Sequence, residues 1–400
     1  MDIIRIDPLD GLGNATSAQA GDVLTFIFPR TGGEAYDLSQ LKLWFTSTIT
    51  GTANRCILPR DVETLIDTLE VYIGDRLIQR IQNYNQIFRI IADYNRDSQH
   101  SESRLLLGNT LPIPHQASSS IYTTDKTQYC MTRWLGLLGC ECMFSQDLTL
   151  AGQMEVKLTL APNSVIVALP ATATYALTDV HMAVPRVKTQ NSQSQSQRIR
   201  YDDYTSIIQQ NSTYQQVTQM GVMGRPDYLM ATFLPANYRS RGVDNDTNHQ
   251  GTSWFFRHGS STTDFATNLL PNMTWNFSLD GQRLIRYNPP QTHFLEYMAW
   301  LFPDGGNSTL ATTRSFSVKG LSLLEAANSI WATGVRVLGS SGLRSMSKSK
   351  SSDDADIDSD IDNKPHQVTF ESHLAPSQTA SSISTSNVTL LIAKSTKSLI

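Results

Sequence analysis

The chain has 400 residues, of which 40% are hydrophobic and only 17% are charged, and its formal net charge is −4. A chain of this length predicts two domains with real hydrophobic cores. A mildly acidic balance disfavours tight, sequence-independent binding of DNA or RNA, because such binding depends on a basic surface. The uncharged polar remainder favours a β-rich chain with many turns over a helical bundle.

Short segments of alternating apolar and polar residues fill the first half of the chain and predict β-strands. The clearest alternation is in Gln153–Pro162, where Met154, Val156, Leu158 and Leu160 share one face. Further strands are predicted at the following segments: Asp22–Pro29, Leu41–Thr50, Met131–Gly139 and Tyr175–Val187.

The composition changes at Lys188–Gln197, a polar segment without an apolar anchor that predicts a connection between domains. A short linking helix is expected next, within Arg200–Gln210. The predicted organisation is therefore a first domain over residues 1–197, a linking helix over 198–210 and a second domain over 211–400.

Strand patterns resume in the second half, at Tyr214–Val222 and Asp227–Pro235 among others. A biased Lys/Ser/Asp segment follows, and it predicts a solvated insertion loop at about residues 340–365. Alternating strands return at the His366 and Asn387 segments, so the loop interrupts a β domain rather than ending it.

Two hairpins repeat one another at an offset of 207 residues. "VYIGDRLIQRI" begins at Val71 and "FSLDGQRLIRYN" begins at Phe277, and both contain Gly-x-Arg-Leu-Ile. The glycines, Gly74 and Gly281, are expected in equivalent turns because glycine readily adopts positive φ. Arg76 and Arg283 are then expected beside the turns, at equivalent places.

An amphipathic segment follows each hairpin. The same offset aligns five apolar or aromatic positions of one segment with five of the other, at helical spacing: Ile87, Phe88, Ile90, Ile91 and Tyr94 with Phe294, Leu295, Tyr297, Met298 and Leu301. The repeat thus predicts two related β domains, each with a short helix inserted after a central hairpin.

With this duplication the chain resembles the double jelly-roll major capsid proteins of the adenovirus, tailless membrane-containing phage and nucleocytoplasmic large DNA virus lineage. Two more passages carry the resemblance. "ATYALTDVHMAVPRV", with "QRIRYDDYTSIIQQ" after it, resembles the family's last strand of the first barrel and its linking helix. "HQVTFESHLAPSQTASSISTSNVTLLI" resembles the closing strand, Pro-Ser loop and final strand.

The resemblance implies an all-β fold of two tandem eight-stranded jelly-roll barrels. It implies a viral major capsid protein whose homotrimers form pseudo-hexagonal capsomers that tile an icosahedral shell. The implied partners are further copies, neighbouring capsomers, minor capsid or penton proteins and an internal membrane, without sequence-specific nucleic acid. The implied location is the virion; the sequence shows no secretory signal pattern at its first residues, so synthesis in the host cell without a signal peptide is expected.

No catalytic, cofactor or metal motif emerges from the sequence. Gly11-x-Gly13 lacks the third glycine of a dinucleotide site and is expected to be a loop. The acidic run Asp354–Asp362 fails the calcium-loop pattern, and the histidines show no metal-ligand spacing. Cys140 and Cys142 are expected to be free structural thiols, since no second cysteine pair completes a zinc site.

Two other classes of protein stay open. One is a carbohydrate-binding or adhesin-like tandem β-sandwich, with Trp254 and its neighbours as a stacking platform. The other is a glycoside hydrolase on a jelly-roll scaffold, for which carboxylates such as Glu63 and Asp67 are candidates. Neither has a motif comparable to the repeat, so the sequence favours a capsid protein that is not an enzyme.

Overall fold

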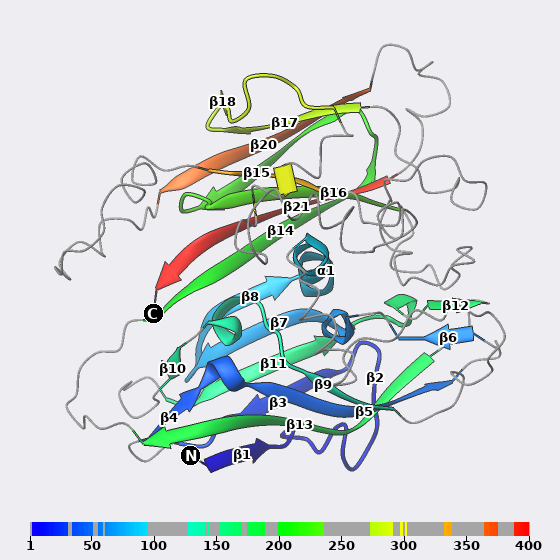
Figure 1. The fold of residues 1–400 in the computed structure, drawn as a ribbon, viewed down its shortest axis with the longest axis vertical. Helices are drawn as coiled ribbons and strands as arrows, with labels where there is room; N and C mark the ends of the chain where they lie inside the picture. Colours follow the sequence, from blue (N-terminus) through cyan, green and yellow to red (C-terminus); the bar gives the residue numbers. More distant parts are fainter. Residues whose placement is uncertain are drawn as a thin grey trace, which may run out of the picture. The chain divides into compact units, whose positions relative to one another are not determined.

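A computed structural model of the chain gives its fold (Figure 1). It describes residues 2–30, 34–50, 55–58, 61–94, 127–140, 142–144, 152–165, 167–169, 174–188, 199–235, 273–290, 297–298, 301, 332–337, 364–374 and 388–399. These residues fall into two compact units, and the chain passes from the first to the second between Asp203 and Tyr204.

An antiparallel sheet around one long strand forms the first layer of the N-terminal unit. The long strand β13 pairs with β1, β2, β4 and β5, while β9 and β10 extend the sheet at its edges. The strands are β1 (Asp2–Ile6), β2 (Ala18–Gln19), β4 (Glu34–Asp37), β5 (Lys42–Thr50), β9 (Thr127–Met131), β10 (Met143–Phe144) and β13 (Thr174–Lys188).

A second antiparallel sheet, in the order β3-β11-β7-β8, forms the other layer. Its strands are β3 (Val23–Ile27), β7 (Ile66–Ile73), β8 (Arg76–Gln82) and β11 (Met154–Leu160). Every second residue of β11 is buried, as a strand with one covered face requires. The buried residues Leu24, Leu69 and Leu158 come from three of these strands and contribute to the core.

Short elements complete the first unit (Figure 1). The strands β6 (Arg55–Ile57) and β12 (Val167–Leu169) pair with each other. Single-turn 3₁₀ helices connect strands: η1 (Leu38–Gln40), η2 (Val62–Leu65), η4 (Gly136–Gly139) and η5 (Asn163–Val165).

The C-terminal unit consists of two four-stranded antiparallel sheets, β14-β21-β16-β19 and β15-β20-β17-β18. The first contains β14 (Arg200–Ser212), β16 (Tyr228–Pro235), β19 (Thr333–Arg336) and β21 (Val388–Leu399). The second contains β15 (Gln216–Met223), β17 (Met273–Leu279), β18 (Gln282–Arg283) and β20 (Pro365–Leu374). Trp275, Phe277, Phe233 and Phe370 are fully buried and form a chain of ring contacts in its core.

The two units have the same strand order. When the eight strands of the C-terminal unit are counted along the chain, its sheets read 1-8-3-6 and 2-7-4-5. The N-terminal unit gives the same two orders if its strands are counted β1 (with β2), β3, β5, β7, β8, β9, β11 and β13. Two facing four-stranded sheets with this order form a jelly roll. The predicted all-β fold of two eight-stranded jelly rolls is therefore confirmed.

One helix of the predicted pair is described in full. Helix α1 (Tyr84–Tyr94) directly follows the β7–β8 hairpin and packs against β7 and η2. Arg89 of α1 forms a buried ion pair with Asp61, at 2.7 Å, which anchors the helix. The helix after the second hairpin is described at Tyr297, Met298 and Leu301, which are helical and buried, and its other predicted positions lie outside the described residues.

The predicted linking helix over 198–210 is wrong, because Arg200–Ser212 is strand β14. Tyr201 belongs to the first unit and donates a hydrogen bond to the Ile78 carbonyl. Tyr204 belongs to the second unit, where its ring contacts Tyr228. Tyr201 and Tyr204 are both buried although they are three residues apart, so this strand does not show the two-residue period of burial that a strand usually has. A spacing of three between aromatic residues is typical of a helix, and the sequence pattern therefore predicted one.

Two further expectations concern the cysteines and the insertion loop. The expected free thiols at Cys140 and Cys142 are wrong, because the two residues form a disulfide across Cα atoms 5.4 Å apart, a usual separation for such a bond. Cys130 is a buried cysteine that takes no part in a disulfide, and desolvation raises the pKa of its thiol to about 11. Most of the predicted insertion loop, residues 340–363, lies outside the described residues.

Candidate functional site: the hairpin turns of the two units

The first repeat turn connects β7 to β8 in the N-terminal unit. Ile73 and Arg76 are the last paired residues, so Gly74 and Asp75 form a two-residue loop. Gly74 has φ +60° and Asp75 keeps a negative φ, which is the pattern of a type II′ turn with glycine at its first position. The positive φ requires glycine at the place where the sequence predicts it.

The second repeat turn connects β17 to β18 and has a different form. Leu279 and Gln282 are the last pair, and both loop residues have positive φ: Asp280 at +51° and Gly281 at +78°. This is the pattern of a type I′ turn, with glycine at its second position. The turn is therefore one residue out of step with the 207-residue offset between the repeats.

The shift also changes the positions of the two arginines. Arg76 pairs with Ile73 directly beside its turn, whereas Arg283 lies one residue further along and pairs with Ser278. Arg283 forms an ion pair with Glu371 at 3.2 Å, and both side chains are partly exposed. Arg76 is exposed and makes no ion pair with any described residue.

A close backbone contact holds the first turn against the start of β11, the seventh strand of its jelly roll. The Gly74 N–H donates to the Gln153 carbonyl at 2.8 Å. A Cβ atom on Gly152 would lie 2.9 Å from the Gly74 Cα, and Gly152 itself has φ +102°. The contact therefore requires glycine at Gly152, both for space and for its backbone conformation.

Side-chain bonds hold the second turn against the start of β20, the seventh strand of the other jelly roll. The Asp280 carboxylate accepts from the Gln367 backbone N–H at 2.8 Å and lies 2.7 Å from His366 Nδ1. The Asp280 N–H in turn donates to the Gln367 carbonyl at 2.8 Å. The Gln367 N–H, and after it the contact with His366, hold the pKa of the Asp280 carboxyl below its ordinary value of 3.8.

Gly152, Asp280 and His366 thus carry structural roles that the sequence reasoning did not assign. The Asp-Gly dipeptide at Asp280 is itself a type I′ hairpin signal and could have identified that residue. Nothing local predicts Gly152 or His366, because their roles depend on a strand far away in the sequence.

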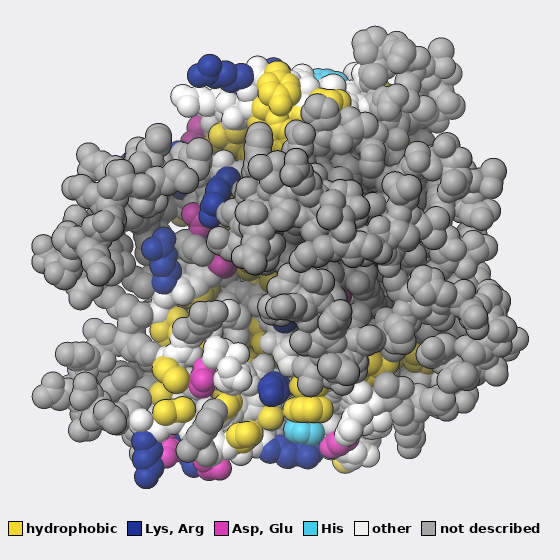
Figure 2. Space-filling view, viewed as in Figure 1, with side chains coloured by type: hydrophobic (Ala, Val, Ile, Leu, Met, Phe, Trp, Pro, Cys, Tyr) yellow, Lys and Arg dark blue, Asp and Glu magenta, His cyan; other side chains and the backbone are white. Residues whose placement is uncertain are grey.

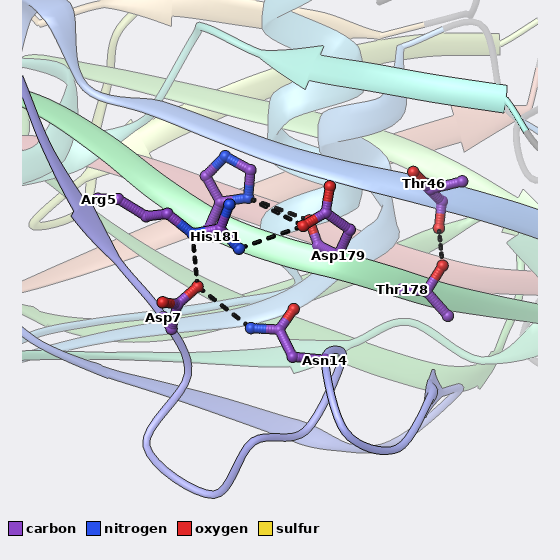
Figure 3. Close-up of polar contacts among 7 residues, drawn as sticks. All are labelled: Arg5, Asp7, Asn14, Thr46, Thr178, Asp179 and His181. Atoms are coloured by element: carbon purple, nitrogen blue, oxygen red, sulfur yellow. Dashed lines mark hydrogen bonds and ion pairs between the residues drawn. The ribbon is translucent and has the colours of Figure 1, made fainter.

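A polar cluster joins the N-terminal segment to β13 (Figure 3). Arg5 lies between two carboxylates, 2.9 Å from Asp7 and 3.2 Å from Asp179, and Asn14 donates to Asp7. These contacts raise the pKa of Arg5, with the hydrogen bond to Asp7 as the largest cause. Asp179 has φ +50° and lies where the register of β13 with β5 shifts, so the cluster covers a β-bulge.

The other candidate residues do not assemble into a reactive site. Within the described parts of the chain, no three His, Cys, Asp or Glu side chains could hold a metal ion. Glu63 is fully buried and Asp67 is half-buried. Gly13 packs so closely on Val180 that a Cβ would lie 2.6 Å from it, so this glycine serves packing rather than phosphate binding.

Some of the remaining candidate residues are described by the structure and others are not. Three histidines are described, and two of them, His181 and His366, lie beside aspartates. The other five histidines, Trp254 and the acidic run Asp354–Asp362 lie outside the described residues. Trp134 and Trp275 are buried. None of the helices described is long and apolar enough to cross a membrane.

A groove of about 520 Å³ lies between the η1 segment and the segment that leads into η4 in the first unit. Several of its side chains already have partners. The Asp37 carboxylate accepts from Ser39 N–H at 3.1 Å, and Trp134 donates to the Leu41 carbonyl at 3.0 Å. Arg133 lies over the Phe88 ring. Asp37, Trp134 and Arg133 are therefore engaged in structural contacts.

Charges of both signs are interspersed on the surface. Figure 2 shows dark blue and magenta side chains alternating among yellow ones over the described part of this face. On the outer face of the β3-β11-β7-β8 sheet, Arg80 pairs with Glu70 and Lys157 with Glu155. The described side chains on this sheet face therefore carry charges of both signs.

No protein-family model and no curated protein sequence matches the chain. Solved structures do match, over its whole length. A chain of the PBCV-1 virus capsid has 12% identity and a TM-score of 0.56, with 100% of this chain and 93% of that chain covered.

Two further structures agree. A chain of the Sputnik virophage structure has 11% identity and a TM-score of 0.56, covering 100% of this chain and 86% of that one. The Faustovirus major capsid protein has 8% identity and a TM-score of 0.51, covering 100% and 90%. The chain therefore has the double jelly-roll fold of viral major capsid proteins.

Proposed function

We propose that this chain is a viral major capsid protein, a structural subunit of an icosahedral shell. The observation that carries the proposal is the match of the whole chain, both jelly rolls included, to capsid chains that are themselves covered for 86% of their length or more. The match extends across both units in one order along the chain. A single shared jelly roll would be much weaker support, because that fold hosts many functions.

The duplication gives such a role a physical basis. Two jelly rolls with the same strand order in one chain allow three chains to present six similar sides. A pseudo-hexagonal capsomer of this kind can tile a surface with one protein. We infer that the partners are further copies of the chain within the capsomer and neighbouring capsomers around it, and that the protein is located in the virion.

The described polar groups support a structural role rather than catalysis. Asp61 and Arg89 form a buried ion pair with each other. Asp280 stabilises the turn between β17 and β18, and Asp179 forms an ion pair with Arg5 at the bulge in β13. We infer that the protein is not an enzyme and uses no cofactor. Minor capsid or penton proteins and an internal membrane are further expected partners, at the loops on the ends of the jelly rolls.

Light scattering on the purified protein after size-exclusion chromatography tests the proposal. The expected result is a stable species of about three times the 44.5 kDa chain mass. Repeating the measurement in high salt is the control, since an obligate interface buries apolar area and resists screening. A monomer under all conditions, especially one that binds glycans, would contradict the capsid role and favour the adhesin-like alternative.

A further inference from the structure

The strand β15 forms one edge of its sheet and exposes apolar side chains there. Val217 is 58% exposed and Met223 is 65% exposed, and Gln219 and Gly221 are exposed between them. The eight residues from Gln216 to Met223 include no charge and no proline. Natural edge strands usually carry such features to prevent pairing with other chains, so β15 lacks the common protection.

The backbone of β15 directs every second residue toward the open edge. Gly224 donates to the Lys364 carbonyl, which fixes the even-numbered residues as the ones that bond to β20. The N–H and C=O groups of Val217, Gln219 and Gly221 therefore point away from β20. The Met223 carbonyl accepts from Lys394 Nζ at 2.8 Å, so only the N–H of Met223 remains for the edge.

The equivalent strand of the first unit is protected. β3 has five residues, and the Thr25 carbonyl at its open edge accepts from the Leu9 N–H at 2.8 Å. The N-terminal segment of the chain thus covers that edge. At the β15 edge, no backbone group of a described residue does the same.

We propose that β15 pairs antiparallel with β15 of a second copy of this chain, about a two-fold axis at Met220. This register places Val217 opposite the partner subunit's Met223, so the exposed apolar side chains meet in two symmetric pairs. It places Gln219 opposite the partner subunit's Gly221, where a Cβ built on the glycine meets nothing within 4 Å. The same register places the odd-numbered residues at the hydrogen-bonding positions, as the direction of their backbone requires. In the 217–223 pairs the Met223 N–H donates to the carbonyl of the partner subunit's Val217, since the Met223 carbonyl already accepts from Lys394.

This pairing deepens the proposed capsid role and rests on it for what the contact joins. Contacts within a three-fold capsomer are heterologous, whereas a two-fold contact uses the same patch on both subunits. The β15 pairing therefore joins the second units of two different capsomers, and it creates one continuous sheet across them.

A register-specific cross-link tests the pairing. In the double variant Val217→Cys with Met223→Cys, the paired Cα atoms would lie about 5.5 Å apart, a separation that a disulfide bridges. The single variants Val217→Cys and Met223→Cys are matched controls, because their thiols would lie about 20 Å from their own copies in the paired strands. Non-reducing electrophoresis should show linked chain pairs from assembled particles of the double variant, and none from its isolated trimers or from the single variants.

Charge and backbone variants give a second measurement. Val217→Lys with Met223→Lys should reduce assembly of trimers into larger particles by roughly tenfold or more, since each added charge faces another across the axis. Gln219→Pro removes an N–H that points to the open edge and should weaken assembly with the β20 ladder intact. Gln282→Lys, on exposed β18 at the other edge of the same sheet, is the control and should assemble normally.

The outcomes separate the two proposals. A chain that forms no trimers contradicts the capsid role itself. Trimers and shells that form without the 217–223 cross-link, or with both lysine substitutions present, contradict the β15 pairing alone. Hydrogen-exchange protection of β15 in such unlinked shells would assign the edge to a strand of a different protein and would also overturn the pairing.

Discussion

The β7–β8 hairpin of the first unit and the β17–β18 hairpin of the second perform the same task by different chemistry. Both fasten the turn between the fourth and fifth strands to the start of the seventh. The first uses a contact between Gly74 and Gly152 that leaves no room for a side chain. The second uses the Asp280 carboxylate, with Gln367 and His366 as partners. Equivalent positions in duplicated jelly rolls thus keep a topological contact while the residues that make it change.

The helices after the two hairpins differ in the same way. The first is anchored by the buried ion pair of Arg89 with Asp61. In the second, Tyr297 donates to the Tyr287 hydroxyl at 2.7 Å and its ring contacts Trp275 edge-on. One unit therefore depends on buried charge where the other depends on aromatic packing, and substitutions should affect the two units unequally.

Arg89→Met should give the largest loss of stability. Its removal leaves the Asp61 carboxylate buried beside an apolar side chain, at a cost of about 3–5 kcal/mol in the free energy of unfolding. Tyr287→Phe, which removes the hydroxyl contact at the other helix, should cost about 1 kcal/mol. Denaturant unfolding of both variants measures the difference, and equal losses would contradict the assigned anchors.

Gly152→Ala should come next, and Gly281→Ala is its matched counterpart. In Gly152→Ala the new Cβ meets the Gly74 backbone, and the alanine is held at an unfavourable positive φ. Together these effects should lower the free energy of unfolding by roughly 2–4 kcal/mol. In Gly281→Ala the Cβ meets nothing within 4 Å. Only the cost of positive φ remains there, about 1–2 kcal/mol. Calorimetry should show a lower melting temperature for Gly152→Ala than for Gly281→Ala. The reverse order would contradict the close contact at the first turn.

A pH dependence should distinguish the second turn from the first. The folded-state pKa of Asp280 is lowered, so its contribution to stability is present above the ordinary value of 3.8 and is lost as pH falls through the folded value. Asp280→Asn keeps an acceptor and tolerates positive φ, so it removes mainly the charge. The difference in melting temperature between wild type and Asp280→Asn should be present at neutral pH and disappear in strong acid. A difference that persists there would show that charge is not its source.

The smallest effect should be at the arginines beside the turns. Arg283→Ala removes an exposed ion pair with Glu371 and should cost about 0.5 kcal/mol or less, decreasing with added salt. Arg76→Ala removes no ion pair to a described residue and should cost less still. Thermal melts at low and high salt compare them; a large, salt-independent loss for either arginine would reveal a packing role that the structure does not show.

The sequence predicted the architecture because its strongest signals are local. Alternation along Gln153–Pro162 predicts a half-buried strand, and Met154–Leu160 is one. Positive φ at Gly74 and Gly281 and the helix at Tyr84–Tyr94 also follow from short segments. The hairpin segment and the amphipathic segment after it recur in the sequence at one offset, and this recurrence allowed the duplication to be inferred.

The linking segment was predicted wrongly because its burial depends on contacts with segments that are distant in the sequence. The burial of Tyr201 and Tyr204 depends on two different units, so a strand was predicted to be a helix. The one-residue shift between the repeat turns follows from which residues pair last, at Ile73 with Arg76 and at Leu279 with Gln282. The Asp-Gly dipeptide at Asp280 is a local signal for the shifted turn, whereas the 207-residue alignment matched Gly281 to Gly74 and so missed the shift.

In the proposed capsomer, the two jelly rolls of each of three chains serve as six similar sides. Electron microscopy of the purified protein tests this arrangement most directly, through two-dimensional averages viewed along the symmetry axis. We expect particles with three-fold symmetry and six lobes of similar size around the axis. Isolated two-lobed monomers, or rings in which only three lobes surround the axis, would contradict it.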